Sequence, residues 1–143
     1  MKISIINGPN LNLLGTREQE VYGDIPFDEY LLKLKKEFPN TDIEYFQSNI
    51  EGELVNFIQD SANSSDGIIL NAAGYTHTSV ALSDAVGSVN VPVIEVHISN
   101  ILAREEYRHI SLIAPRCRGS IFGLGLSGYR LAIIALQDLL INR

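Results

Sequence analysis

Residues 3–23 read ISIINGPNLNLLGTREQEVYG, an apolar run that passes directly into a polar segment. The first four of these residues have the composition of a buried strand. The segment that follows carries three asparagines, an arginine and a tyrosine, which is more polar side chain than a connection needs. Loops with such side chains usually carry function. We therefore expect a buried first strand followed by a functional loop.

The rest of the chain repeats this alternation between strand-like and helix-like segments. Isoleucine- and valine-rich runs occur at residues 3–6, 43–46, 67–70, 92–98 and 120–124. Helical periodicity lies between and after them, at residues 27–38, 50–63, 79–89, 102–113 and, with Ser127 as the expected N-cap, on to residue 141. Nearly continuous apolar runs are typical of parallel strands covered on both faces. The pattern predicts one α/β domain over residues 1–143, a flavodoxin-like doubly wound five-stranded parallel sheet in the order 2-1-3-4-5.

Composition narrows the possible partners. The formal charge of −6 argues against nucleic acid or an anionic membrane surface as partner. Cys117 is the only cysteine, so neither a disulfide framework nor a cysteine-based zinc site is expected. No targeting segment is evident, and no apolar run approaches the roughly 20 residues that span a bilayer. These features predict a soluble, cytoplasmic protein, and the arginines in its loops leave room for a small anionic ligand.

Polar clusters follow three of the predicted strands. They lie at residues 7–12, 71–77 and 95–100, after the first, third and fourth strands. In a sheet of order 2-1-3-4-5 the winding reverses between strands one and three, and ligands bind beyond the carboxyl ends of the strands at that point. The three clusters are therefore expected to form one crevice.

The three histidines are His77, His97 and His109, and their spacing matches no metal motif. His97 lies on an apolar strand two residues after Glu95, which places both side chains on one strand face. That arrangement suits a general acid or base oriented by a carboxylate, while a hydrogen-bonded core histidine is the alternative. His109 is expected on the solvated face of a helix and is given no role. The sequence thus predicts no metal.

Cofactor chemistry is not predicted either. The first strand is followed by neither a phosphate-binding GxxxxGK[ST] loop nor a dinucleotide-binding GxGxxG turn. Lys2 begins the first strand, at the end opposite the crevice, and the other three lysines lie on or beside the polar face of the first helix. An imine mechanism needs a desolvated lysine in the pocket. Any carbonyl chemistry here is therefore expected to proceed without an imine.

Two further pairs of residues each allow a functional and a structural interpretation, and the sequence alone does not decide between them. Tyr22 follows Arg17 by five residues in a loop bounded by Gly15 and Gly23. The tyrosine can be a base whose phenolate the guanidinium stabilises, or it can simply pack the loop beside a solvated arginine. Asp84 follows His77 by seven residues, which predicts one shared helical face at the mouth of the crevice; a plain surface aspartate is the alternative.

Five segments together resemble the type II 3-dehydroquinate dehydratases. They are INGPNLNLLGxRexxxYG at 6–23, FQSNxEGxLV at 46–55, NAAGYTHTSVALxDA at 71–85, PVIEVHISNxxxREexR at 92–108 and GxIxGLGxxGYxLA at 119–132. They cover almost the whole chain in order and at matching spacing. The resemblance implies an anti elimination of water from 3-dehydroquinate through an enol or enolate, without metal or imine, in the shikimate pathway.

The resemblance also implies roles for individual residues. Tyr22 looks like the base that removes the C2 proton, and Arg17 like the residue that stabilises its phenolate. His97 looks like the acid that protonates the departing C1 hydroxyl, and Glu95 like the group that orients it. Asn10 is similar to the residue that holds a water molecule at the enolate oxygen.

The expected substrate ligands are Asn71, His77, Ile98, Ser99 and Arg108. Asn71 is also expected to assist His97, and the Ile98 backbone and Ser99 hydroxyl to hold the substrate carboxylate. Asp84 matches a residue that reaches the site of a neighbouring subunit in a trimer, with four trimers forming a dodecamer.

Two other classes of function use the same crevice. A module that binds a sugar acid or flavin would need neither Tyr22 nor Arg17, and substituting either would leave binding nearly intact. A metal-dependent hydrolase would need His77 and His97 together, and chelation would abolish its activity.

Overall fold

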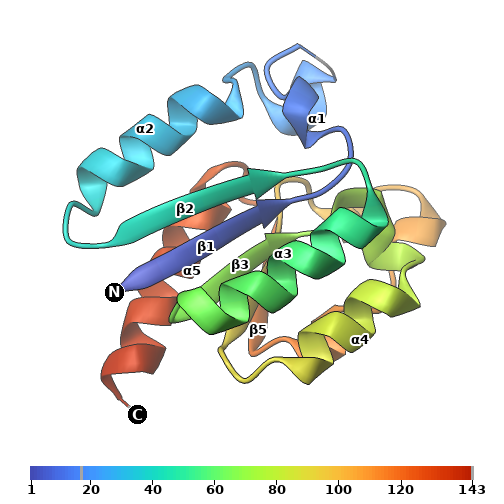
Figure 1. The fold of residues 1–143 in the computed structure, drawn as a ribbon. Coiled ribbons are helices and arrows are strands. Elements are labelled where there is room, and N and C mark those ends of the chain that lie inside the picture. The colour runs from blue at the N-terminus through green and yellow to red at the C-terminus, as the bar shows by residue number, and fades with distance from the viewer. Residues whose placement is uncertain (17, 143) are drawn as a thin grey trace.

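The computed structural model describes residues 1–16 and 18–142. Arg17, one of the predicted site residues, lies outside them. The five strands form one parallel sheet in the order β2-β1-β3-β4-β5, which confirms the predicted winding (Figure 1). Their bounds are β1 (Lys2–Asn7), β2 (Asp42–Gln47), β3 (Gly67–Asn71), β4 (Val93–His97) and β5 (Gly119–Phe122). The register sets Asn7 of β1 beside Asn71 of β3, so that the polar ends of these strands meet.

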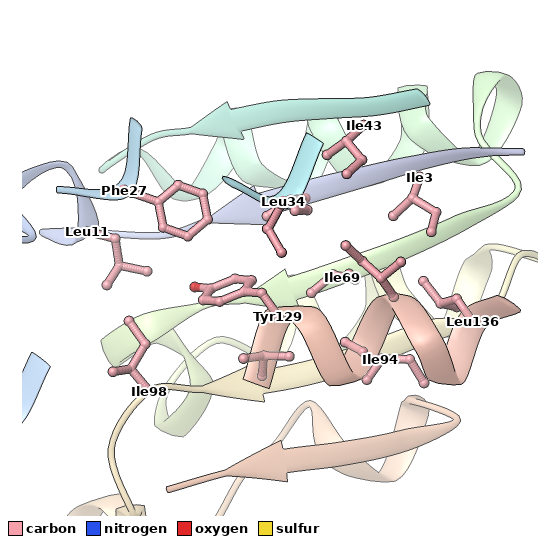
Figure 2. Packing of buried hydrophobic residues seen from close by; sticks show 14 of the residues in the cluster. Ile3, Leu11, Phe27, Leu34, Ile43, Ile69, Ile94, Ile98, Tyr129 and Leu136 are labelled. Atoms are coloured by element: carbon pink, nitrogen blue, oxygen red, sulfur yellow. The ribbon is translucent and has the colours of Figure 1, made fainter. Parts of the chain in front are cut away.

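Helices cover both faces of the sheet. They are α1 (Gln19–Tyr22), α2 (Phe27–Glu37), α3 (Glu51–Ser64), α4 (Val80–Ser88) and α5 (Ser127–Ile141). Alternate residues of β1 separate into two cores: Ile3 and Ile5 pack with residues of α2 and α5, while Ile6 packs with α3 and α4. Figure 2 shows the first of these cores, in which the Tyr129 ring of α5 lies close to Phe27 of α2. A sheet covered on both faces explains why its inner strands are almost wholly apolar.

The helix predicted over residues 102–113 is wrong. Two short 3₁₀ helices, Ile101–Ala103 and Glu106–Arg108, lie in this part of the chain, and a third, Ala114–Arg116, follows it. Backbone groups that a continuous helix would pair internally bond elsewhere: the Leu112 N–H donates to the carbonyl of Thr76, and the Arg104 carbonyl lies 3.0 Å from His109 Nε2. His109 therefore lies in a loop and not on the face of a helix. Side-chain bonds of this kind compete with helix formation, and residue periodicity does not register them.

Two smaller expectations also need correction. Ser127 is the first residue of α5 and not its N-cap; Leu126 holds that position, and no side chain caps it. His77 and Asp84 do not share a helical face, because His77 ends a 3₁₀ helix (Ala73–His77) and Asp84 belongs to α4. The break lies at Ser79, whose hydroxyl accepts a hydrogen bond from the Leu82 N–H and starts α4 afresh.

Candidate active site

A pocket of about 110 Å³ lies at the carboxyl ends of β1, β3 and β4, where the polar clusters were expected to converge. Eight of the predicted site residues line it, namely Asn10, Tyr22, Asn71, His77, His97, Ile98, Ser99 and Arg108. Pro9, Leu11, Ala73, Gly74, Ile101 and Arg104 complete the lining. Glu95 lies behind His97, and Asp84 is an exposed residue of α4 outside this lining.

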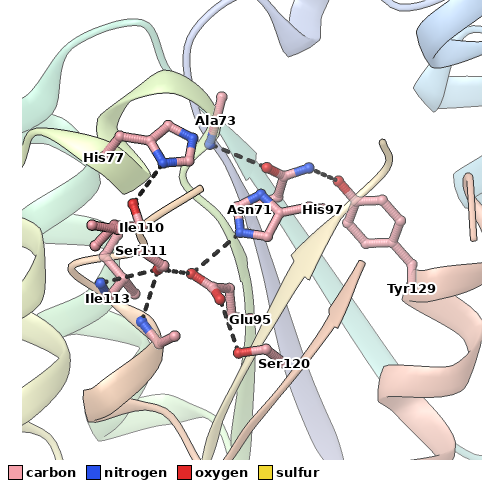
Figure 3. A network of polar contacts seen from close by, with 11 residues as sticks. Asn71, Ala73, His77, Glu95, His97, Ile110, Ser111, Ile113, Ser120 and Tyr129 are labelled. Atoms are coloured by element: carbon pink, nitrogen blue, oxygen red, sulfur yellow. Dashed lines mark hydrogen bonds and ion pairs between the residues drawn. The ribbon is translucent and has the colours of Figure 1, made fainter. Parts of the chain in front are cut away.

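His97 and Glu95 form a buried pair at the end of β4, with 5% and 2% of their surfaces exposed. The Nε2 atom of His97 lies 3.2 Å from Glu95 Oε2, although the ring N–H is not aligned for a regular hydrogen bond. Because an ionised carboxylate only accepts, the contact favours a proton on Nε2. That leaves Nδ1 as the ring nitrogen that is free to exchange a proton with a ligand (Figure 3).

The Glu95 carboxylate is held by two serine hydroxyls as well. Ser111 Oγ donates to Oε2 at 2.6 Å, and Ser120 Oγ donates to Oε1 at 2.8 Å. Burial by itself raises the pKa of Glu95, but the contact with His97, the charge of His97 and the two hydroxyls together lower that pKa below its ordinary value. An ionised Glu95 is thus available to orient His97.

His77 lies next to His97, with ring centroids 6.4 Å apart. Its Nδ1 is 2.9 Å from the carbonyl of Ile110, and because a carbonyl only accepts, Nδ1 must carry the hydrogen. Burial, followed by the positive charges of His97 and Arg108, lowers the pKa of His77, although the Ile110 carbonyl opposes the shift. The neutral ring therefore offers Nε2 as an acceptor, which suits a substrate hydroxyl.

Asn71 ends β3 with its side chain almost fully buried. Its Oδ1 accepts a hydrogen bond from the Ala73 N–H at 3.1 Å. Ala73 has a φ of +53°, a left-handed conformation that costs energy in a residue with a Cβ. The Asn71 side chain thus holds the turn that carries Ala73 and Gly74 into the pocket wall.

Asn10 also adopts the left-handed conformation, with a φ of +69°. Its N–H donates to Asn49 Oδ1 at 2.9 Å, and Asn49 follows β2 in the chain. Gln47 at the end of β2 donates from Nε2 to the Gly8 carbonyl at 3.1 Å and so ties the same segment down. The FQSN motif therefore fixes the backbone at Asn10, although the sequence assigned it no role.

Tyr22 is the last residue of α1 and is half-buried. Arg104 donates from Nη1 to the Tyr22 hydroxyl at 2.9 Å and to Ser99 Oγ at 3.3 Å, and its Cζ lies 5.4 Å from the centre of the Tyr22 ring. The guanidinium thus places a charged donor at the phenol oxygen. Sequence reasoning did not assign Arg104 to the site, although it is the first arginine of the REexR motif.

Arg108 reaches the pocket from the second of the three 3₁₀ helices. It donates from Nε to Glu105 Oε2 at 2.6 Å, and the exposed carboxylate holds the guanidinium in place. Ile98 and Ser99 follow β4 directly, so their backbone groups lie at the carboxyl edge of the sheet. With Arg104 and Arg108, the pocket places two cations beside these groups, which suits an anionic ligand.

The described residues offer neither a lysine in the pocket nor a cluster of metal ligands. None of the four lysines lines the pocket. Within residues 1–16 and 18–142, no three His, Cys, Asp or Glu side chains gather closely enough to hold a metal ion. None of the helices in the described part of the chain has the length and apolarity that a membrane crossing requires.

Comparison with known proteins matches residues 1–137 to the family described as Dehydroquinase class II. The chain belongs to this family. It is 54% identical to a 3-dehydroquinate dehydratase of Fusobacterium nucleatum subsp. nucleatum, over 96% of this chain and 97% of the relative. The crystal structure of a type II dehydroquinase from Butyrivibrio crossotus matches with a TM-score of 0.91 at 48% identity, covering 96% of this chain and 97% of the other. A second, from Propionibacterium acnes, matches with a TM-score of 0.90 at 39% identity over 94% of each chain.

Proposed function

We propose that this chain removes water from 3-dehydroquinate by anti elimination, giving 3-dehydroshikimate through an enol or enolate in the shikimate pathway. The observation that carries the proposal is the meeting of Tyr22, held by Arg104, and His97, paired with Glu95, in one pocket. Membership of the class II dehydroquinase family supports it independently. Lysine and metal have no part in this mechanism.

Tyr22 is the base in this mechanism. Its phenolate takes the proton from C2, and the electrons of the C–H bond pass into the C3 carbonyl to give the enolate. Arg104 places a charged donor 2.9 Å from the phenol oxygen that takes the proton. Arg17, which lies outside the described residues, has the same role by resemblance. Asn10 holds the water molecule that donates to the enolate oxygen, and the clamp from Asn49 keeps its backbone in place.

His97 is the acid. In the second step the enolate electrons return, the C1–O bond breaks, and the proton from His97 leaves with the hydroxyl as water. Because Nε2 faces Glu95, Nδ1 delivers this proton. The ionised Glu95 stabilises the protonated ring before transfer and keeps its orientation afterwards.

The remaining pocket residues bind the substrate. Asn71, the neutral His77 and Arg108 hold the hydroxyl groups, and Asn71 also assists His97. The Ile98 backbone and the Ser99 hydroxyl hold the carboxylate, and Arg104 supplies a positive charge beside Ser99. The ring of 3-dehydroquinate is thereby fixed between base and acid.

The proposed active unit is a homo-oligomer in the cytoplasm, a dodecamer built from four trimers. Asp84 is exposed on α4, away from the pocket of its own chain, as a residue that completes a neighbour's site would be. Sedimentation at assay concentration tests this assembly. A fully active monomer would contradict it.

An absorbance assay tests the reaction itself. Adding 3-dehydroquinate to the purified chain should produce the absorbance of the conjugated enone. The rate should withstand borohydride, because no imine forms, and EDTA, because no metal takes part. Inactivation by borohydride in the presence of substrate, or loss in EDTA with recovery in zinc, would point to a different mechanism, and the absence of enone would refute the proposed reaction.

A further inference from the structure

A buried network of hydrogen bonds lies behind Asn71, and Tyr129 of α5 is at its centre. The Tyr129 hydroxyl accepts from Asn71 Nδ2 at 2.9 Å (Figure 3). It donates to Asn7 Oδ1 at 2.8 Å. Asn7 in turn donates from Nδ2 to the Tyr45 hydroxyl at 3.3 Å. The network joins α5 to the ends of three neighbouring strands, β3, β1 and β2. Tyr129 does not line the pocket, but its hydrogen bond to Asn71 connects it to a residue that does.

The direction of each bond in this network is determined. Asn71 Oδ1 faces the Ala73 N–H, so it must be the acceptor, and the amide nitrogen must face Tyr129. Tyr129 then accepts from Asn71, and its single hydrogen is left for Asn7. A rotated Asn71 amide would set a donor against the Ala73 N–H. The Ala73 N–H therefore selects the orientation of the Asn71 amide, and the Tyr129 hydroxyl anchors the amide in that orientation by accepting from Nδ2.

Tyr129 is suited to this task by its surroundings. Its side chain is fully buried, and its ring lies 4.9 Å from the ring of Phe27 in an edge-on arrangement. Burial raises the pKa of the phenol far above its ordinary value, so the hydroxyl keeps its hydrogen at every working pH. The bond to Asn71 is thus a permanent part of the fold.

We propose that Tyr129 is a positioning residue for catalysis, which orients the Asn71 amide toward the substrate and His97. This inference rests on the proposed function of Asn71. One amide hydrogen of Asn71 is given to Tyr129, which leaves the other for a ligand in the pocket. Without the hydroxyl, the amide loses the acceptor that anchors Nδ2 and is held only through Oδ1 by the Ala73 N–H, while the ring, the core and the pocket lining remain in place.

The main test is Tyr129→Phe, which removes only the hydroxyl. We expect kcat/KM to fall about 10-fold to 100-fold, with most of the loss in kcat, because misplaced groups chiefly affect the transition state. Tyr45→Phe is the matched control: it removes a hydroxyl from the same network, but one that bonds Asn7 and not Asn71. Its kcat/KM should stay close to that of the unsubstituted chain. Equal losses in the two variants would overturn the proposal.

A double-mutant cycle shows whether Tyr129 acts through Asn71. In an Asn71→Ala background, Tyr129→Phe should cause no further loss of kcat. Full additivity would mean that the hydroxyl serves packing alone and would overturn the proposal. If Tyr129→Phe folds poorly, Asn7→Ala replaces it in the cycle, because it removes the acceptor that directs the Tyr129 hydrogen. The same absence of additivity is expected for Asn7→Ala, and full additivity would again overturn the proposal.

An NMR measurement separates this inference from the proposed function. The Asn71 side-chain amide hydrogens should exchange with solvent faster in Tyr129→Phe than in Tyr45→Phe. This readout needs no turnover, so a chain without dehydratase activity would refute the reaction and leave the positioning test intact. Unchanged exchange in Tyr129→Phe would refute the positioning role.

Discussion

The floor of the pocket and the loop beside it are built differently. On the floor, Asn71, Glu95 and His97 are at most 5% exposed and stand at the ends of central strands. In the loop, Asn10 and Glu18 have positive φ, and Tyr22 ends a helix of only four residues. Buried strand ends keep their geometry without a ligand, whereas such a loop is held by a few polar contacts.

In the proposed mechanism, one proton transfer therefore takes place at the rigid strand ends and the other at the loop. The proposed acid, His97, lies against Glu95, which two serine hydroxyls hold from behind. The proposed base, Tyr22, accepts a hydrogen bond from Arg104, which comes from a distant segment of the chain. A rigid acid and a base on a loop can each be tested by removing one group.

The largest effect is expected from Tyr22→Phe. The change removes the proton acceptor but keeps the ring, so kcat should fall by roughly 10⁴-fold with a modest change in substrate affinity. Tyr30→Phe is the matched control, because Tyr30 is also half-buried and packs against the same core. Steady-state kinetics on both variants decide the outcome. Normal kcat in Tyr22→Phe would show that the loop only covers the site and that another group takes the proton.

His97→Ala should have the next largest effect, a fall in kcat of roughly 10³-fold, because the departing hydroxyl loses its acid. The rigid floor should otherwise remain, so dehydroquinate should still bind, as isothermal titration can show. If the variant turns over at a near-normal rate, His97 returns to its alternative role as a hydrogen-bonded core residue.

Much of the fold could be predicted from the sequence because its signals are local. Apolar runs predicted all five strands. The strand order followed from the number of strands and from their alternation with helices. The segment at 102–113 failed because its backbone groups bond to distant partners such as Thr76. Periodicity describes which face of a segment is apolar, but it carries no information about those bonds.

The site residues likewise include some that the sequence predicts and some that it does not. Residues at strand ends, such as Asn71 and His97, could be placed in one crevice from topology alone. Arg104 could not, since it is 82 positions from Tyr22 and no spacing rule connects them. Tyr129, 58 positions from Asn71, was visible only as part of an apolar helix. Contacts over such distances emerge from the packed fold.

The smallest effect is expected from Ser120→Ala, which removes one of the two serine hydroxyls that bond Glu95. The pKa of Glu95 lies below its ordinary value of 4.5, so the ionised group contributes stability that is full above that pH and is lost as pH falls through the lower folded value. Removing the Ser120 hydroxyl takes away one hydrogen bond to Glu95 Oε1 and raises the pKa of Glu95 in the folded protein.

The Ser120→Ala variant should therefore be less stable by about 1 kcal/mol at neutral pH, and the difference should shrink in acid, where Glu95 is protonated in both proteins. Thermal unfolding from about pH 7 to about pH 3 measures this, with a shift in Tm of about 2–4 °C at neutral pH. Ser64→Ala is the control, because its hydroxyl donates to a backbone carbonyl of its own helix, that of Asp60. A Ser120→Ala shift that is the same at every pH would mean that the hydroxyl does not act through the charge of Glu95.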